Sequence, residues 1–176
     1  MSRNIGVIFF LLSLVMAFYV LPKSPEFPKP PNDAVQSNEP ADIESTDRRG
    51  YYTNLSREEI IKHYENEFNV VNGFDIYTPR LNYPPEEAPA LIRDQTKSTY
   101  LEEIVHPLRE SIYINGFEPQ TNEYAQYFDG KKWNQKIIVR YVRGPIWVRI
   151  FTVFGASMLA YFLILEIKNA KYLKKI

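Results

Sequence analysis

The sequence predicts an α+β protein in which a small antiparallel sheet, with helices packed on one face, is flanked by N- and C-terminal transmembrane helices. Two uncharged apolar runs, residues 5–21 and 150–165, lie near the two ends of the 176-residue chain. The polar segment between them shows both helical periodicity and strand-like alternation, and it is long enough for one domain. The chain is therefore expected to be anchored in a bilayer at both ends.

The first apolar run, residues 5–21, is predicted to form an N-terminal anchor within residues 1–21. Crossing about 30 Å of hydrocarbon takes about 20 helical residues, so its 17 residues are marginal and suit a thin bilayer. Pro22 ends the helix, and Tyr19 falls at the depth of the headgroups. A cleaved signal peptide is the alternative, because Arg3 gives a positive flank, but no small-x-small cleavage site precedes the prolines.

Residues 22–50 are predicted to form a disordered, proline-rich linker. Six prolines occur in the 19 residues from Pro22 to Pro40, among polar residues with almost no apolar content. Such a composition favours extended polyproline II structure, which would hold the next domain away from the first helix. A docking motif for an aromatic-lined groove is the alternative interpretation.

Residues 51–143 are predicted to form one extracytoplasmic α+β domain. Its first helix begins at Ser56, where Ser56 and Glu59 fit a capping box. Asn72-Gly73 ends that helix, and residues 74–78 then alternate as a half-buried strand does. The apolar face of the helix consists of Ile60, Ile61, Tyr64 and Phe68.

Two further helices are expected in this domain. Residues 86–96 follow two prolines and begin with two glutamates, which favour a helix start. Residues 99–112 give the clearest amphipathic pattern, because their apolar side chains recur at i, i+3, i+4, i+7 and i+11. Thr99 and Glu102 fit another capping box, and Pro107 predicts a kink. The apolar positions are Leu101, Ile104, Val105, Leu108 and Ile112.

Beyond Asn115-Gly116 the pattern changes to that of strands. Residues 124–128 and 133–142 predict two strands joined by a tight turn at Asp129-Gly130, a strong hairpin signal. Helix, Asn-Gly and strand also recur at spacings of 44 and 43 residues, which indicates either a duplicated unit or a chance resemblance. A duplication would give a pseudo-symmetric sandwich with helices on one face of the sheet.

Residues 146–167 are predicted to form a second transmembrane helix of 22 residues, followed by a basic cytoplasmic tail at 168–176. Only two hydroxyl residues interrupt the apolar centre of this helix, which argues against a buried amphipathic helix of a soluble protein. Trp147 is expected in the interfacial belt, and Arg149 is expected to extend its side chain to the headgroups.

Small residues predict where the membrane helices approach other helices. Thr152, Ala156 and Ala160 are four residues apart, and Ser13 and Ala17 form a similar face on the first helix. Small side chains let helix backbones come close in a membrane. The two spans associate with each other or with further copies, unless the stripe reflects only ordinary membrane-helix composition.

Basic residues near the apolar runs predict that both termini are cytoplasmic and that residues 22–145 are extracytoplasmic. Arg3 precedes the first helix and four lysines follow the second, although Arg140, Arg143 and Arg149 on the other flank oppose this orientation. The segment 22–143 carries 15 basic and 20 acidic residues, which argues against a nucleic-acid partner. The expected partners are the lipid bilayer and other membrane proteins or further copies.

The sequence contains no catalytic, metal or cofactor signature. It has no cysteine and only two histidines, so no thiolate nucleophile, metal site or cofactor is expected. His106, Arg109 and Glu110 are weak catalytic candidates for proton transfer, with a structural role as the alternative. The Asn54-Leu55-Ser56 triplet fits N-glycosylation, unless Ser56 serves only as a helix cap.

Three classes of function follow from these observations. The leading hypothesis is a non-enzymatic, membrane-anchored interaction module, such as an accessory or assembly subunit of a membrane complex. The first alternative is a membrane-bound hydrolase or transferase that uses His106 with a carboxylate and binds an anionic substrate through Arg93 or Arg109. The second is a ligand-sensing ectodomain. Two apolar runs, a tyrosine-rich central domain and the lack of catalytic motifs favour the leading hypothesis.

Overall fold

The structure, a computed structural model, divides the chain into two units. Unit 1, Met1–Ser24 with Gly144–Ile176, is called the helix pair here, and unit 2, Pro25–Arg143, is called the sheet domain. The residues that the structure describes are 2–24, 26–71, 74–75, 78–83, 99–119 and 122–173.

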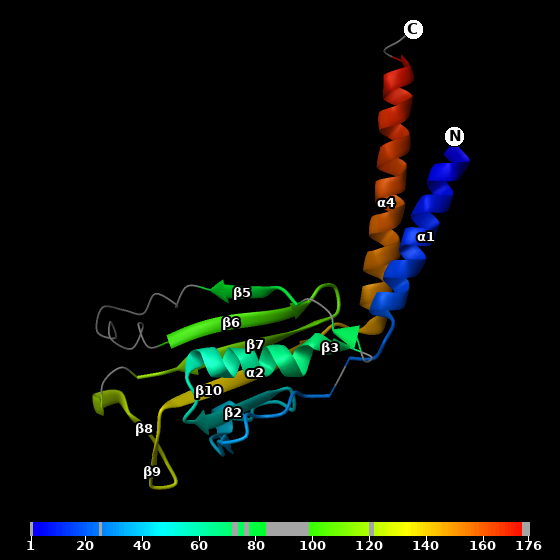
Figure 1. The fold of residues 1–176 in the computed structure, drawn as a ribbon. Coiled ribbons are helices and arrows are strands. Elements are labelled where there is room, and N and C mark those ends of the chain that lie inside the picture. Colours follow the sequence, from blue (N-terminus) through cyan, green and yellow to red (C-terminus); the bar gives the residue numbers. More distant parts are fainter. Residues whose placement is uncertain are drawn as a thin grey trace. The chain divides into compact units, whose positions relative to one another are not determined.

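The sheet domain is built on a six-stranded antiparallel sheet with strand order β1-β2-β10-β7-β6-β5 (Figure 1). The predicted α+β class and antiparallel sheet are confirmed. Long central strands pair over their whole length, since β7 is bonded to β10 on one side and to β6 on the other. The strands are β1 (Val35–Gln36), β2 (Arg48–Thr53), β5 (Arg80–Tyr83), β6 (Thr99–His106), β7 (Glu110–Phe117) and β10 (Gln135–Arg143).

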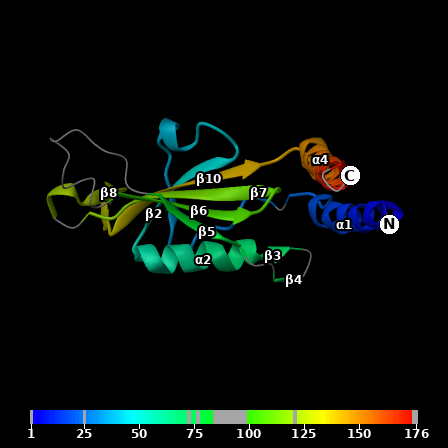
Figure 2. The same ribbon diagram turned by 90° about the horizontal axis from the view of Figure 1, so that it is seen from above.

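Helix α2 (Arg57–Asn69) packs along one face of this sheet (Figure 2). The predicted capping box is confirmed, because the Ser56 backbone N–H and hydroxyl each donate to Glu59 Oε2 at 2.8 Å. The predicted apolar face is buried against the sheet, where each such side chain contributes about 1.5–3 kcal/mol. Those helix residues, Ile60, Ile61, Tyr64 and Phe68, share one core with Tyr51, Tyr100, Ile104, Ile112, Ile114, Ile137, Val139 and Tyr141.

Smaller elements complete the domain. The predicted Asp129-Gly130 turn is confirmed between β8 (Gln126–Phe128) and β9 (Lys131–Trp133), with φ of 55° and 69° at its two central residues. Both angles are positive, as a type I′ hairpin turn requires. The predicted helix at 86–96 lies outside the described residues. The remaining elements are β3 (Val70–Val71), β4 (Phe74–Asp75), η1 (Pro40–Asp42) and η3 (Asn122–Tyr124).

The predicted amphipathic helix at 99–112 is wrong, because this segment forms the β6–β7 hairpin. A β-turn closes it, with the Arg109 N–H donating to the His106 carbonyl at 3.0 Å. The alternation of a strand was hidden because Glu102, His106 and Glu110 occupy buried positions that usually hold apolar residues. Each of these side chains pairs with a charged or imidazole side chain that lies next to it only in the folded sheet.

Asn115-Gly116 is not a turn but part of β7, so of the two interpretations of the recurring pattern the chance resemblance fits and the duplicated unit does not. Gly116 lies inside β7, directly opposite Tyr100 of β6. A Cβ at residue 116 would lie 2.0 Å from the Tyr100 ring, so glycine is required here for close approach rather than for a positive φ. The second half of the proposed repeat is a hairpin, whereas the first contains helix α2.

The structure also differs from the predicted linker at 22–50, because β1, η1 and the first half of β2 fall within it. Phe27 and Ala34 pack against the core, and the Asp47 carbonyl accepts a hydrogen bond from the Tyr141 N–H at 2.8 Å. Asp42 forms an ion pair of 2.8 Å with Lys136 of β10. Isolated polar residues fix this segment through partners about 90 residues away, and such partners leave no local pattern.

The helix pair consists of α1 (Ser2–Val20) and α4 (Ile146–Leu173). Within the described residues, one helix, Ile146–Ala170, is long and apolar enough to cross a membrane, whereas the apolar part of α1, Ile5–Val20, is shorter than that test requires. A single membrane-competent helix is weak support for a membrane protein. Of the two expected transmembrane helices, only α4 could cross a membrane by length and composition within the described residues.

The two helices of this unit run antiparallel. Gly6 near the start of α1 faces the Tyr161 ring towards the end of α4, and Phe9 packs edge-on against that ring at 6.1 Å between centroids. At the other end of the pair, Arg149 in the first turn of α4 contacts the Val20 carbonyl at the end of α1. The start of α1 and the end of α4 therefore lie at the same end of the helix pair.

Candidate functional site

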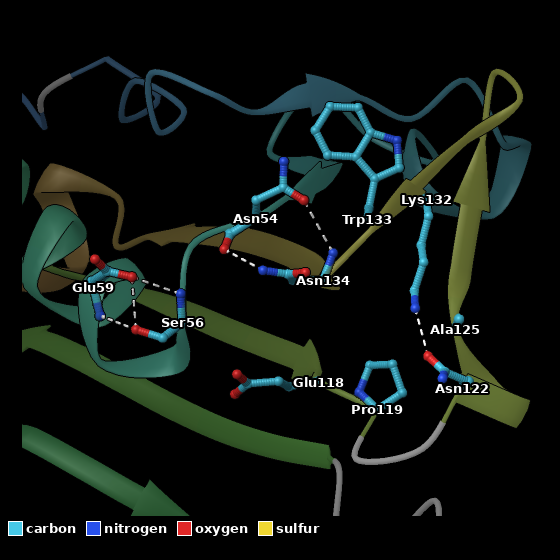
Figure 3. Close-up of a pocket in the computed structure, with 10 residues that line it drawn as sticks. All are labelled: Asn54, Ser56, Glu59, Glu118, Pro119, Asn122, Ala125, Lys132, Trp133 and Asn134. Carbon is cyan, nitrogen blue, oxygen red and sulfur yellow. Dashed lines mark hydrogen bonds between the residues drawn. The ribbon is translucent and has the colours of Figure 1, made fainter.

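A polar pocket of about 350 Å³ opens at one end of the sheet domain (Figure 3). Three segments distant in the sequence form its walls: the entry to α2, the segment after β7, and the β9–β10 connection. Pairing of β10 with both β2 and β7 brings them together. The pocket is lined by Asn54, Ser56, Glu59, Glu118, Pro119, Asn122, Ala125, Lys132, Trp133 and Asn134.

Hydrogen bonds fix the walls of this pocket. The Asn134 side chain donates to the Asn54 carbonyl at 2.7 Å, and Lys132 Nζ donates to Asn122 Oδ1 at 2.6 Å. On the opposite wall, bonds from the Ser56 backbone and hydroxyl lower the pKa of Glu59, so its carboxylate stays ionised. Glu118 carries no hydrogen bond to the other residues drawn in Figure 3.

The chemistry of these walls suits the binding of a small polar molecule. Two carboxylates, amide groups and one ammonium can hydrogen-bond it, and no histidine or cysteine is among the described lining residues. No cluster of three potential metal ligands occurs among the described residues. The sequence did not reveal this site, because its residues are ordinary loop residues until the strand pairing assembles them.

The predicted catalytic candidates do come together, but in the protein interior. His106 Nδ1 lies 2.9 Å from Glu110 Oε1, and Arg109 Nε lies 3.2 Å from the same oxygen. The His106 ring also stacks on Phe68 with 3.9 Å between centroids. The His106 and Glu110 side chains are 0% exposed, so a substrate cannot reach them. This cluster fixes the β6–β7 turn, and Arg93 lies outside the described residues.

The predicted helix-packing residues fall on two different surfaces of the helix pair. Ser13 and Ala17 of α1 are buried, together with Val153 of α4. Thr152 and Ala156 are exposed, and Ala160 is half-buried. The small-residue face of α1 therefore packs within the pair, whereas most of the stripe on α4 does not.

Arg149 differs from its predicted role, because it does not extend away from the helices. It is 2% exposed, and its guanidinium donates to the carbonyls of Val20 at 3.5 Å and Pro22 at 3.2 Å and to the Ser24 hydroxyl. A cation at a helix C-terminus satisfies free carbonyls and complements the helix dipole. Of the other predicted interfacial residues, Trp147 is 71% exposed and Tyr19 is half-buried.

Comparison with known proteins gives no relative for this chain. No protein-family model matches it, and no curated protein or solved structure matches it significantly. Its function therefore has to be argued from its own residues.

Proposed function

We propose that this protein is a non-enzymatic, membrane-anchored interaction module, an accessory or assembly subunit of a membrane complex. The observation that carries the proposal is the surface of α4. Only 6% of the most apolar 18-residue stretch of this helix is buried, and large apolar side chains cover its exposed sides. Exposing apolar surface to water costs about 25 cal/mol of free energy per Å². The exposed residues include Phe151, Phe154, Met158, Leu159, Phe162, Leu163 and Ile167.

The second span of the proposal is α1. Its 16 apolar residues from Ile5–Val20 reach about 24 Å as a helix, which suits a thin bilayer or one that thins locally. Antiparallel packing against α4 supports a topology with both termini on one side. The lysines after α4 favour the cytoplasm for that side, which would make the sheet domain extracytoplasmic.

A partner helix is proposed on the exposed small-residue stripe of α4. Thr152 and Ala156 are exposed, and the Thr152 hydroxyl bonds within its own helix to the Val148 carbonyl at 2.9 Å. This side of α4 therefore offers a smooth surface that another backbone can approach closely. The partner is another membrane protein or a second copy of this chain.

Gentle solubilisation of the full chain tests the subunit proposal. We expect a complex larger than the monomer, and we expect Ala156→Phe to dissociate it by blocking the close approach. Met158→Phe, at an exposed position on the opposite side of α4 from this stripe, is the matched control and should leave the complex intact. Recovery of the native chain alone, at monomer size, would overturn the subunit proposal.

Membrane insertion and sidedness are tested separately. The chain has no cysteine, so single cysteines at the exposed positions Asn38 and Asn169 report their own compartments. We expect an impermeant maleimide to label Asn38→Cys from the extracytoplasmic side and Asn169→Cys only after lysis. Extraction of the chain from membranes by alkaline carbonate would contradict the integral membrane assignment.

The polar pocket supports a second candidate function, that of a ligand-sensing ectodomain. Its walls contain Trp133, so a Trp147→Phe variant has one tryptophan and that residue reports on the pocket. We expect a small ammonium compound such as ethanolamine to change its fluorescence, and Glu118→Gln to weaken the response. Identical responses to ethanolamine and to uncharged glycerol would count against recognition by the carboxylates.

A further inference from the structure

The tip of the β6–β7 hairpin combines two unusual features. Leu108 has a φ of 64°, and it is one of two non-glycine residues with positive φ in the described part of the chain. The left-handed region is unfavourable for a leucine. The Leu108 side chain is also 49% exposed, beside exposed Pro107. A strained backbone here thus presents an apolar side chain outwards instead of burying it.

The buried cluster beneath the tip holds this conformation. Glu110 accepts contacts from both His106 and Arg109, and the Arg109 N–H closes the turn. Three ionisable residues are therefore committed to a short turn, residues 107–109, whose exposed leucine is not part of the core. Backbone strain that a rigid environment maintains is characteristic of functional positions.

The hairpin tip lies at the end of the sheet that is joined to α4. Arg143, the last residue of β10, pairs with Glu110, so residues 107–109 extend beyond the end of β10. Only Gly144 and Pro145 separate Arg143 from the start of α4 at Ile146. Three Cα steps span at most about 11 Å. Wherever α4 enters the bilayer, this end of the sheet is covalently held near the headgroups.

The other connection leaves the sheet domain at the same end. Phe27 packs edge-on against Tyr141 near the end of β10, with 6.4 Å between ring centroids, and its neighbour Glu26 begins the described part of the domain. Both chain segments that lead to the helix pair thus depart beside the β6–β7 turn.

We infer that the β6–β7 tip is a lipid-contacting element, in which Leu108 inserts into the headgroup–acyl boundary of the bilayer that holds α4. An apolar side chain gains free energy there because it leaves water, as in other interfacial anchors. This inference rests on the proposed membrane insertion of α4.

The two hairpin tips of the domain provide a matched test. Asp129 has the same left-handed conformation, with φ of 55°, but its hairpin follows β7 at the opposite end from Glu110. Single-cysteine variants Leu108→Cys, Asp129→Cys and Met158→Cys carry an environment-sensitive NBD label in phosphatidylcholine vesicles. Doxyl-labelled lipid at shallow depth serves as the quencher.

We expect the Leu108 probe to show blue-shifted emission and to be quenched by shallow doxyl lipid, while the Asp129 probe resembles a probe in water. The Met158 probe, on the exposed surface of α4, reports whether the helix is inserted. If the Met158 probe is in lipid but the Leu108 probe behaves like the Asp129 probe, only the inference about the β6–β7 tip is overturned. If Met158 is in water, the proposed membrane insertion fails as well.

A second variant separates lipid contact from folding. Leu108→Asn suits the left-handed conformation and removes the apolar group, so the sheet domain should unfold at the same temperature or higher. A lower unfolding temperature would show that Leu108 has a role in the fold, and that result would contradict the inference.

Discussion

Helices α2 and α4 use their side chains in opposite ways. On α2 the buried residues are apolar, and the polar face is exposed. On α4 the most buried residue is Arg149, whereas the exposed residues include Phe151 at 76% and Leu159 at 68%. The difference shows that the two helices are built for different surroundings, since α2 is stabilised by the sheet in water and α4 requires a neighbour that is itself apolar.

The largest expected effect tests this contrast directly. Ile60→Ala removes a fully buried side chain between α2 and the sheet, and it should lower the free energy of unfolding of the sheet domain by about 2–5 kcal/mol. Leu159→Ala on α4 removes a similar apolar group from an exposed position and should change that free energy little. Urea unfolding of the full chain in detergent, followed by near-ultraviolet circular dichroism, measures both. Equal losses would refute the contrast.

The next effect concerns Arg149, the charged residue that α4 buries. Arg149→Ala leaves the carbonyls of Val20 and Pro22 without their cation, which should weaken the helix pair by about 1.5–3 kcal/mol. The yield of a short bis-maleimide cross-link between Gly6→Cys and Tyr161→Cys should fall. Arg149→Lys keeps the charge without the planar fork and should give an intermediate yield. Thr152→Ala, at an exposed position, is the control that should leave the yield unchanged.

A third prediction concerns the close packing on the sheet face under α2. Gly116→Ala places a methyl group where the Tyr100 ring lies, and it should cost about 1–3 kcal/mol through overpacking. Displacement of the ring should also weaken the 2.7 Å hydrogen bond that the Tyr100 hydroxyl donates to Gln135. Gly130→Ala has open space around it but a φ of 69°, so its cost of about 1–2 kcal/mol would come from backbone strain alone. A Gly116→Ala variant as stable as the native chain would contradict the overpacking explanation.

The smallest expected effect is a dependence of the domain's stability on pH, which arises from Glu39. The bond from Lys136, and then that from Tyr52, lowers the pKa of Glu39 below its ordinary value of 4.5. Its contribution to stability is therefore present above pH 4.5 and is lost as the pH falls through the lowered pKa. Because Glu39 is half-exposed, Glu39→Gln should cost below about 1 kcal/mol. Urea midpoints between pH 3 and 7 should depend less on pH in the variant.

Local patterns in the sequence were enough for several elements. The Ser56–Glu59 capping box and the apolar spacing of α2 are both found in the structure. Asp129-Gly130 specified its turn because few residue pairs adopt two positive φ angles. The apolar composition of α4 was evident for the same reason, since it depends on no partner in the chain.

Other features were decided only by tertiary structure. Leu101 to Ile112 has a helical spacing by chance, and the segment becomes a hairpin because β10 and β5 pair with its two strands. Its polar residues Glu102 and His106 are stable inside the core only next to Arg57 and Glu110. The polar pocket likewise has no local signal, because its walls are joined by strand pairing alone.

The sequence by itself determined the elements whose stability is local: capped helix, tight turn and apolar span. Tertiary structure decided the identity of residues 99–117, the ordering of residues 26–50 on the sheet, and the burial of Arg149. The physical reason is the range of the interactions involved. A cap or a turn is satisfied within four residues, whereas a strand edge or a buried charge is satisfied only by a partner that folding brings from elsewhere in the chain.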